Sequence, residues 1–319
     1  MLAYVMRRLA YGVVVVLGVL LLLFVLFFTV ASPDDIARRA LGEKARPDAI
    51  AQWKQNHGYD RPLWPWQGGD SLLVHHYSTM LRFEFGDSDT DGVAIAERLR
   101  RGAGPSLSLT LPLFVLEVAT ALLVGLLVAI FRSTYIDRAA TWICVLGMSV
   151  AAPLYIIGAQ YLIAKLLRWF PLSGFDPSFE LAARFLALPI GVGVVSALGS
   201  EVRFLRTVFV EETSRDYVRT ARAKGASEMR VMLRHVLRNS LIPVLTRVIV
   251  QIPFLFTGSL LFESFFGIPG LGSMTFDAIG NNDFATLRVM VYIGALAFVA
   301  AQIATDVSYA LVDPRVRLE

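Results

Sequence analysis

The chain has 319 residues, of which 55% are hydrophobic and 18% are charged, and its formal net charge is +4. This composition excludes an ordinary soluble domain, because apolar runs of about twenty residues match the roughly 30 Å hydrocarbon core of a bilayer. The basic residues concentrate between the apolar runs, which indicates membrane orientation and argues against nucleic-acid binding. The single cysteine, Cys144, cannot form an internal disulfide.

Nearly uncharged runs are predicted to be six membrane-spanning helices, so the fold class is an all-α membrane protein. These runs are residues 9–31, 106–131, 139–164, 185–200, 240–262 and 289–311. The first run follows Arg7 and Arg8, a pattern shared with cleaved secretory signals. It is longer than a usual signal core of about 7–15 residues, so we expect an uncleaved first helix.

Basic residues beside the runs agree on one orientation. Arg132 and Arg138 follow the second run, a basic segment follows the fourth, and Arg315 and Arg317 follow the sixth. Because cytoplasmic loops are enriched in Lys and Arg, both termini are expected in the cytoplasm. The predicted order is therefore a first helix (1–31), an extended first periplasmic loop (32–105), a five-helix core (106–311) and a cytoplasmic tail (312–319).

The long loop after the first helix contains three aromatic residues with two possible roles. Trp64, Trp66 and Tyr77 could lie at the depth of the lipid headgroups, where aromatic rings are favoured. They could equally hold together a folded cap outside the membrane. The sequence leaves both interpretations open.

The basic segment, residues 206–239, is predicted to form two short helices, over 217–224 and 227–238. Gly225 lies between them and can turn the chain with little strain, while the Ser227 hydroxyl can cap the second helix. The small side chains of Ala221 and Ala223 would let a partner surface approach closely. From composition alone, an ordinary solvated basic loop explains the segment as well.

Several sequence blocks carry a family resemblance. The segment DYVRTARAKGAS…RHVLRNSLIP resembles the cytoplasmic loop of oligopeptide/dipeptide-type ABC importer permeases, B-type subunit. SVAAPLYIIG…WFPLSG, ESFFGIPGLG and DVSYALVDPRVR are similar to further blocks of that family, and the likeness extends over nearly the whole chain. The resemblance implies the type I ABC importer permease fold, in the bacterial inner membrane. It assigns ATPase coupling to Tyr217, Arg219, Thr220, Ala221, Arg222, Ala223, Lys224 and Gly225.

The same resemblance implies the partners and the activity. The partners would be a second homologous permease, two cytoplasmic ATPase subunits and an extracytoplasmic substrate-binding protein. ATP and Mg²⁺ would bind to the ATPase subunits, so no cofactor is expected in this chain. The chain would import peptides, with ATP hydrolysis by its partners driving alternating access.

Residues 263–272 are expected to close the outer end of the fifth run. Pro269, Gly270 and Gly272 favour a tight non-helical turn, which is tolerated where protein or water covers the backbone. An apolar plug would come from Phe265, Phe266 and Leu271. The segment is either an outer gate or binding-protein contact, or a structural turn. The candidate residues of the translocation path or gate are Glu117, Glu263, Phe266, Pro269, Gly270, Leu271 and Gly272.

Ionisable residues inside apolar runs suggest function, because charge is costly in lipid. Glu117 could face a substrate path, although a structural hydrogen bond is the favoured interpretation. Arg247 and Asp306 lie near the cytoplasmic ends of their runs, where snorkelling or an ion pair explains them.

Enzymatic motifs are missing from the sequence. No G-x-x-x-x-G-K-[ST] nucleotide-binding loop occurs, and neither the histidines nor Cys144 form a metal-binding or nucleophilic pattern. A non-catalytic transport subunit is therefore predicted. An ion-coupled secondary transporter is the first alternative, but no convincing internal repeat is present. A membrane-embedded enzyme is the second.

Overall fold

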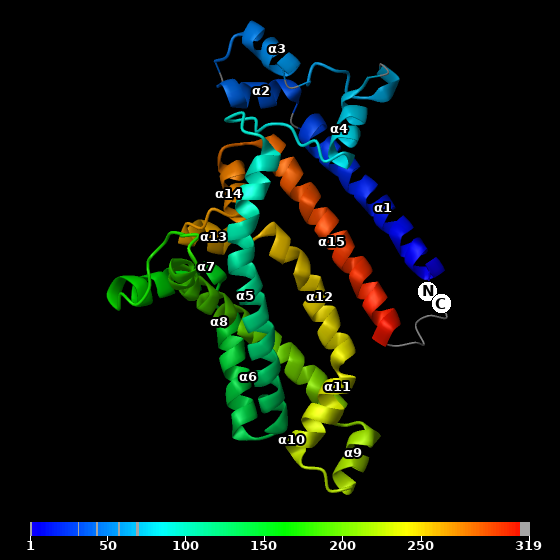
Figure 1. Ribbon diagram of the computed structural model, residues 1–319, viewed down its shortest axis with the longest axis vertical. Helices are drawn as coiled ribbons and strands as arrows, with labels where there is room; N and C mark the ends of the chain where they lie inside the picture. Colours follow the sequence, from blue (N-terminus) through cyan, green and yellow to red (C-terminus); the bar gives the residue numbers. More distant parts are fainter. Residues whose placement is uncertain (1, 31, 43, 57, 68–69, 313–319) are drawn as a thin grey trace.

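The computed structural model describes residues 2–30, 32–42, 44–56, 58–67 and 70–312. These residues are mostly helical, and their only β pairing is a single antiparallel bridge between Asp87 and Ala94. The predicted all-α class is therefore confirmed. Figure 1 shows an elongated bundle with α2–α4 at one end and α9–α10 at the other. Arg315 and Arg317 lie outside the described residues.

Four of the described helices are long and apolar enough to cross a bilayer. They are α1 (Leu2–Phe24, continued by a π-helix over Val25–Val30), α5 (Ile95–Ile130), α8 (Phe179–Glu212) and α15 (Phe284–Val312). Both α5 and α8 are longer than the apolar runs that predicted them. Their polar ends continue as helix beyond the apolar part. α5 packs against α8, α12 and α14, and α8 packs against α5 and α6.

The third apolar run is broken, so the prediction of one continuous helix over 139–164 is wrong. It forms α6 (Tyr135–Met148), then α7 (Ala152–Ala159) with a π-helix (Gln160–Leu166), and the two parts meet at 91°. Pro153 lies in the first turn of α7, where its missing N–H is tolerated. The same residue in the middle of a continuous helix would remove a hydrogen bond and clash with the preceding turn.

The fifth run also ends earlier than predicted. It forms α12 (Leu241–Thr257), followed by α13 (Leu260–Phe266) and α14 (Leu271–Gly280). Gly258 terminates α12 with φ +73°, a conformation that favours glycine. The apolar part of α12 is too short to be counted as a span by length and composition. These criteria give four spans among the described helices, or five if the bent α6–α7 pair is one span.

The helices pack in two groups. In one group α5 and α6 pack against α8, and in the other α1 and α12 pack against α15, while α5 and α12 join the groups. Ion pairs link helices in the bundle. The distances are 2.5 Å for Asp137–Arg206, 2.7 Å for Glu201–Arg247 and 3.2 Å for Arg8–Asp306. Ion pairing is therefore the correct interpretation of Arg247 and Asp306.

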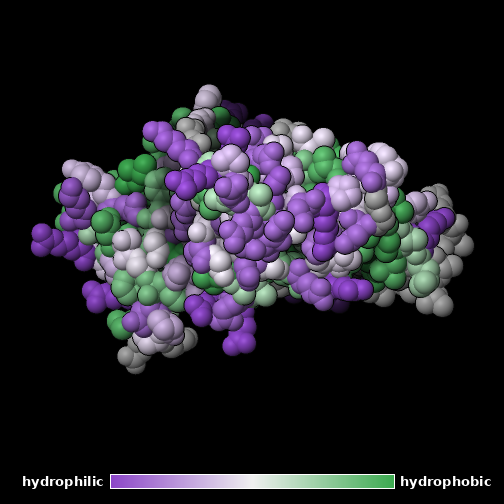
Figure 2. Space-filling model, turned by 90° about the horizontal axis from the view of Figure 1, so that it is seen from above, coloured by the Kyte–Doolittle hydropathy of each residue, from purple (hydrophilic) through white to green (hydrophobic). Residues whose placement is uncertain are grey.

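Residues 32–94 fold into a compact cap on the end of α1 and α15. The cap contains α2 (Pro33–Leu41), α3 (Pro47–Asn56), a 3₁₀ turn (Pro65–Gln67) and α4 (Leu72–Leu81). The backbone N–H of Asp35 donates to the Ser32 hydroxyl, which caps α2. Seen from above the cap, the surface is largely hydrophilic, with hydrophobic patches among the polar residues (Figure 2).

An aromatic core holds the cap to α1. Phe24 packs edge-on against Trp64, which in turn stacks on Trp66 at 4.9 Å. The Tyr77 hydroxyl donates to the carbonyl of Leu17 over 2.8 Å. These contacts support the folded-cap interpretation of the aromatic residues.

His76 supplies a pH-dependent part of this contact. Its ring lies 3.2 Å from the carbonyl oxygen of Leu20, between Phe24 and Phe28. Burial, aided by the charge of Arg288, lowers the pKa of His76 from 6.5 to about 3. The folded cap thus holds a neutral ring that the unfolded chain protonates below about pH 6.5.

We predict that the stability contributed by His76 is complete above about pH 6.5 and is lost as the pH falls toward 3. Thermal unfolding between pH 7.5 and pH 4.5 should show this loss in the wild type. His76→Leu should flatten the dependence, while His235→Leu, at the opposite end of the molecule, should leave it unchanged. An unchanged pH slope in His76→Leu would contradict the prediction.

Candidate functional site

The basic segment forms two short helices, as predicted. The first is α9 (Asp216–Ala223). The second runs without interruption through α10 (Glu228–Val231), a π-helical turn (Met232–Val236) and α11 (Leu237–Asn239). The sequence predicts a coupling loop over 206–239, but α8 continues to Glu212. We therefore use the name coupling loop, after that predicted role, for residues 213–240, which lead from the end of α8 into α12.

Gly225 forms the junction between the two helices. It has φ +81°, and two hydrogen bonds close the end of α9: Ala226 N to Ala221 O (3.2 Å) and Gly225 N to Arg222 O (2.9 Å). This pattern is a Schellman motif, in which a left-handed residue ends a helix. Ser227 occupies the N-cap position of α10, but its side chain makes no capping hydrogen bond, so that part of the prediction is wrong.

Side chains brace the two helices against each other and against α8. Arg222 donates Nε and Nη2 hydrogen bonds to the two carboxylate oxygens of Glu228, at 2.8 and 3.1 Å. The Tyr217 hydroxyl donates to Glu212 at the end of α8. Burial and this hydrogen bond raise the pKa of Tyr217 to about 12, so its hydroxyl keeps its proton. Arg222 and Tyr217 therefore fix the shape of the loop.

The inner face of the coupling loop is an apolar core shared with the bundle. Val218 and Val231 are fully buried, and their neighbours include Leu205 and Phe209 of α8 and Val244 of α12. Ala221 is also buried, at 8% exposure. It therefore packs inward, and the predicted role of Ala221 in close approach by a partner is wrong.

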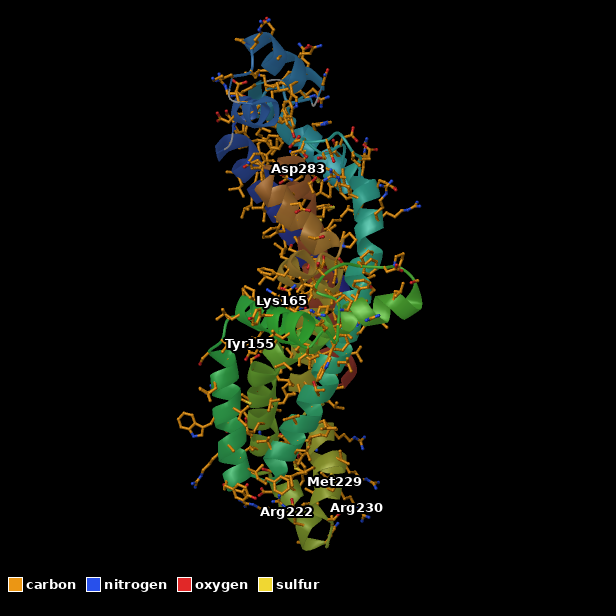
Figure 3. The ribbon with its side chains drawn as sticks, turned by 90° about the vertical axis from the view of Figure 1, so that its left-hand side faces the viewer. Tyr155, Lys165, Arg222, Met229, Arg230 and Asp283 are labelled. Carbon is orange, nitrogen blue, oxygen red and sulfur yellow. The ribbon has the colours of Figure 1, made fainter. Side chains whose placement is uncertain are left out.

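The outer face combines cations with exposed apolar side chains. Most of the predicted coupling residues are exposed on this face, namely Arg219, Thr220, Arg222, Ala223, Lys224 and Gly225. The second helix adds Met229 and Leu233, each 52% exposed, which the sequence reasoning missed. Their spacing of four residues places them on one face of the helix, but the sequence does not show that this face is exposed. Figure 3 shows Arg222, Met229 and Arg230 together at this end of the molecule.

Glu263 lies at the opposite end of the bundle in a cage of hydrogen bonds. It is fully buried, and its Oε1 accepts from the Ser106 hydroxyl (2.9 Å) and Ser259 N (3.0 Å). Its Oε2 accepts from Ser273 N (3.0 Å), in the first turn of α14. A buried carboxylate at a helix N-terminus is stabilised by these N–H groups and by the helix dipole.

Close packing around Glu263 explains the glycines of this segment. A Cβ atom on Gly270 would lie 2.3 Å from Glu263 Oε2, and one on Gly272 would lie 2.6 Å from Ser259 C. Pro269 lies in the short connection between α13 and α14. Phe266 and Leu271 are buried whereas Phe265 is 37% exposed, so the three side chains do not form one plug. The geometry favours a structural turn, and a gate stays a prediction.

Glu117 lies between α5, α8 and α12. Its carboxyl group is hydrogen-bonded to the Gln251 side chain and shares a cavity of about 20 Å³ with Glu201 and Arg247. The favoured structural hydrogen bond is present, and a role in the substrate path stays a prediction. Among the described residues, no group of three or more His, Cys, Asp or Glu is placed to hold a metal ion.

Comparison with known proteins matches two parts of the chain to one type of transporter. Residues 121–318 match the family "Binding-protein-dependent transport system inner membrane component", and residues 1–68 match the N-terminal domain of such membrane components. The chain is 33% identical to the glutathione transport system permease protein GsiC of Salmonella choleraesuis over 99% of both chains. Its identity to the protein of that name from Escherichia coli K12 is also 33%, again over 99% of both.

We predict that the turn around Glu263 tolerates no side chain at Gly270. Gly270→Ala should lower the free energy of unfolding by roughly 1–3 kcal/mol, as overpacking of a tight core does. Gly280→Ala, at the other end of α14, is the matched control, because its Cβ meets nothing within 4 Å. Thermal unfolding of the two variants in detergent tests this, and equal stability would contradict it.

Proposed function

We propose a coupling mechanism for this chain, which belongs to the family of binding-protein-dependent transport system inner membrane components. The chain is a peptide-type ABC importer permease, a multi-pass protein of the inner membrane. The family matches over most of the length carry this conclusion. They favour it over the secondary transporter and the membrane-embedded enzyme.

We propose six spans with both termini in the cytoplasm. The four long helices supply four spans, the bent α6–α7 pair a fifth, and α12 the sixth. The apolar part of α12, Leu241–Pro253, is about 20 Å long at 1.5 Å per residue, and α13 extends it toward the outer face. Figure 1 supports this orientation, since α1 begins and α15 ends away from the cap. The cap is then periplasmic and the coupling loop cytoplasmic.

The outer face of the coupling loop is the proposed docking surface for an ATPase subunit. It offers an apolar centre, Met229 and Leu233, beside the exposed cations Lys224 and Arg230. Apolar surface surrounded by polar groups is typical of protein–protein interfaces. The cations would pair with carboxylates of the partner.

The inner face of the loop supplies the mechanical link. ATP binding closes the ATPase subunits, and a displacement of the loop is transmitted to α5, α8 and α12 through the buried core around Val218 and Val231. Tightly packed cores transmit displacement because they contain little free volume. Alternating access of the bundle follows.

We infer that the complete importer contains a second permease, two ATPase subunits and a substrate-binding protein. ATP and Mg²⁺ bind to the ATPase subunits, and this chain holds no cofactor of its own. The relatives named for glutathione transport support a short peptide as cargo. We also propose that residues 263–272, while forming a structural turn, present the exposed Phe265 to the binding protein.

The purified chain should hydrolyse no ATP, because its sequence contains no nucleotide-binding loop. Reconstitution with its ATPase and second permease should create turnover that the binding protein stimulates. Phosphate release in proteoliposomes measures both. Robust hydrolysis by the chain alone, with contaminating ATPases excluded, would contradict the proposal.

Gly225→Val should uncouple the importer without affecting membrane insertion. A β-branched residue at φ +81° costs about 1–3 kcal/mol, which shifts a docking equilibrium roughly 5- to 150-fold. We expect weaker ATPase association, or ATP hydrolysis without uptake, measured by co-purification and by transport into vesicles.

Gly42→Val is the matched control for backbone strain. Gly42 has φ +97° and open space around it, but it lies in the cap at the other end of the molecule. It should insert, associate and transport normally. Full uptake and unchanged association in Gly225→Val would remove the loop from the coupling mechanism.

A further inference from the structure

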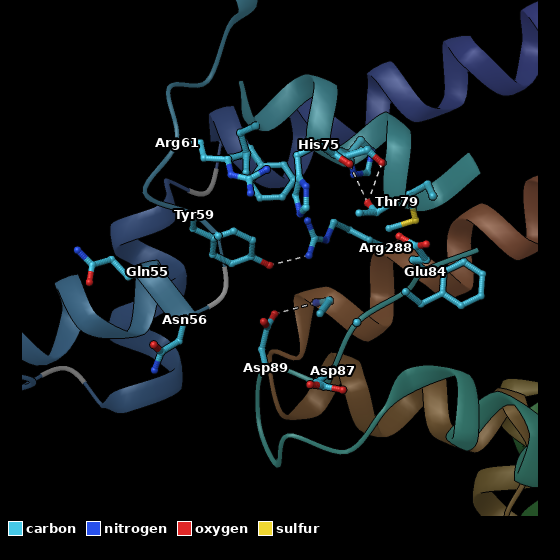
Figure 4. Close-up of a pocket in the computed structure, with 18 of the residues that line it drawn as sticks. Gln55, Asn56, Tyr59, Arg61, His75, Thr79, Glu84, Asp87, Asp89 and Arg288 are labelled. Carbon is cyan, nitrogen blue, oxygen red and sulfur yellow. Dashed lines mark hydrogen bonds between the residues drawn. The ribbon is translucent and has the colours of Figure 1, made fainter. Parts of the chain in front are cut away.

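A cavity of about 620 Å³ lies inside the cap, away from the coupling loop and the outer turn. Its walls come from α3, α4, residues 84–92 and the first turns of α15 (Figure 4). This volume is within the range of about 300–1,000 Å³ that is usual for small-molecule sites. The proposed import mechanism makes no use of the cavity.

Arg288 lies in this cavity with part of its hydrogen-bonding capacity unused. The residue is 8% exposed, its Nη2 donates to the Tyr59 hydroxyl over 2.6 Å, and its guanidinium lies 4.5 Å from the ring centre of Phe28. Its Nε–H is buried and has no hydrogen-bond partner among the described residues. Leaving a buried charged donor unpaired is costly, so this group points to an acceptor that a ligand would supply.

Charges of both signs surround Arg288, because Glu84 lies near His75 and the Arg61 side chain pairs with Asp70 at 3.4 Å. Arg61 and His75 lie on one side of the Tyr59–Arg288 pair, and Asp87 and Asp89 lie on the other (Figure 4). Burial and the charge of Arg61 lower the pKa of His75, which favours the neutral ring and a hydrogen-bonding role.

Two of the acidic side chains at the cavity, Asp87 and Glu84, are exposed to solvent. A simple anion such as sulfate would bind Arg288 but would be repelled by these carboxylates. A ligand with one carboxylate and one ammonium group can accept from the unused donor of Arg288 and donate to the exposed carboxylates.

We propose that the cap cavity binds a short zwitterionic peptide, with its terminal carboxylate on Arg288 and its terminal ammonium group near Glu84 and Asp87. The site would belong to the permease itself and lie outside the bundle. It goes beyond the coupling mechanism and does not depend on it, because binding here requires neither ATPase nor binding protein.

The test uses the full chain alone in lipid nanodiscs, with L-alanyl-L-alanine as the probe and calorimetry as the measurement. Three further probes are the C-amide, the N-acetyl derivative and the doubly blocked dipeptide. We expect the free dipeptide to bind, and each single block to weaken binding at least about tenfold, because each removes a charge-assisted contact. Absence of binding by the free dipeptide, or equal binding of all four probes, would overturn the proposal.

Variants assign the two ends of the ligand. Arg288→Gln should make binding insensitive to C-amidation, and the double variant Glu84→Gln/Asp87→Asn should make it insensitive to N-acetylation. Arg82→Gln replaces an exposed arginine at the end of α4, outside the cavity, and should bind as the wild type does.

The double variant keeps the test decisive if Arg288→Gln unfolds, because both of its positions are exposed. Thermal unfolding of each variant shows whether it is folded, and only the binding results of folded variants are used. A double variant that folds and keeps the full N-acetylation penalty would overturn the assignment of the ammonium end. The two proposals can fail separately. If the assembled importer does not transport while the chain alone still binds the dipeptide, only the coupling mechanism is contradicted.

Discussion

The apolar core beneath the coupling loop is the constraint on which the rest of the account depends. A polar loop between two membrane helices would normally be free to move, because short helices are marginal without tertiary packing. Here Val218, Val231 and Val236 are fully buried against α5, α8 and α12. The loop and the cytoplasmic half of the bundle therefore behave as one packed unit, and a force applied to the exposed face reaches the spans directly.

Charge pairing inside the bundle complements this core. Asp137–Arg206 and Glu201–Arg247 join α6 to α8 and α8 to α12, next to the apolar contacts that carry the coupling loop. Only the carboxylates of these pairs are buried, so replacing either arginine would leave a buried negative charge without its partner. At the outer end, the buried carboxylate of Glu263 is held by the backbone N–H groups of Ser259 and Ser273. Both ends of the bundle are thus held by specific polar contacts, while the interior depends on packing.

The sequence predicted the helical class, the two helices of the coupling loop and the turn at Gly225, because each depends on local signals. It missed the 91° bend before Pro153, since hydropathy records composition and not direction. It assigned Ala221 to a partner surface, although that side chain packs inward. Which face of a short helix is buried depends on distant residues such as Phe209 and Val244. The Arg288 cavity was likewise invisible, because it joins Tyr59 to a residue far along the chain.

The central claim is that the coupling loop and the cytoplasmic ends of α5, α8 and α12 move as one body. Spin labels at Lys224→Cys in the loop and Phe131→Cys at the end of α5, in a Cys144→Ala background, report their separation by pulsed electron resonance. The account predicts the same distance distribution in the assembled importer without nucleotide and with ATP bound. A shift or a broadening of that distribution on ATP binding would show that the loop moves independently of the bundle, and would contradict it.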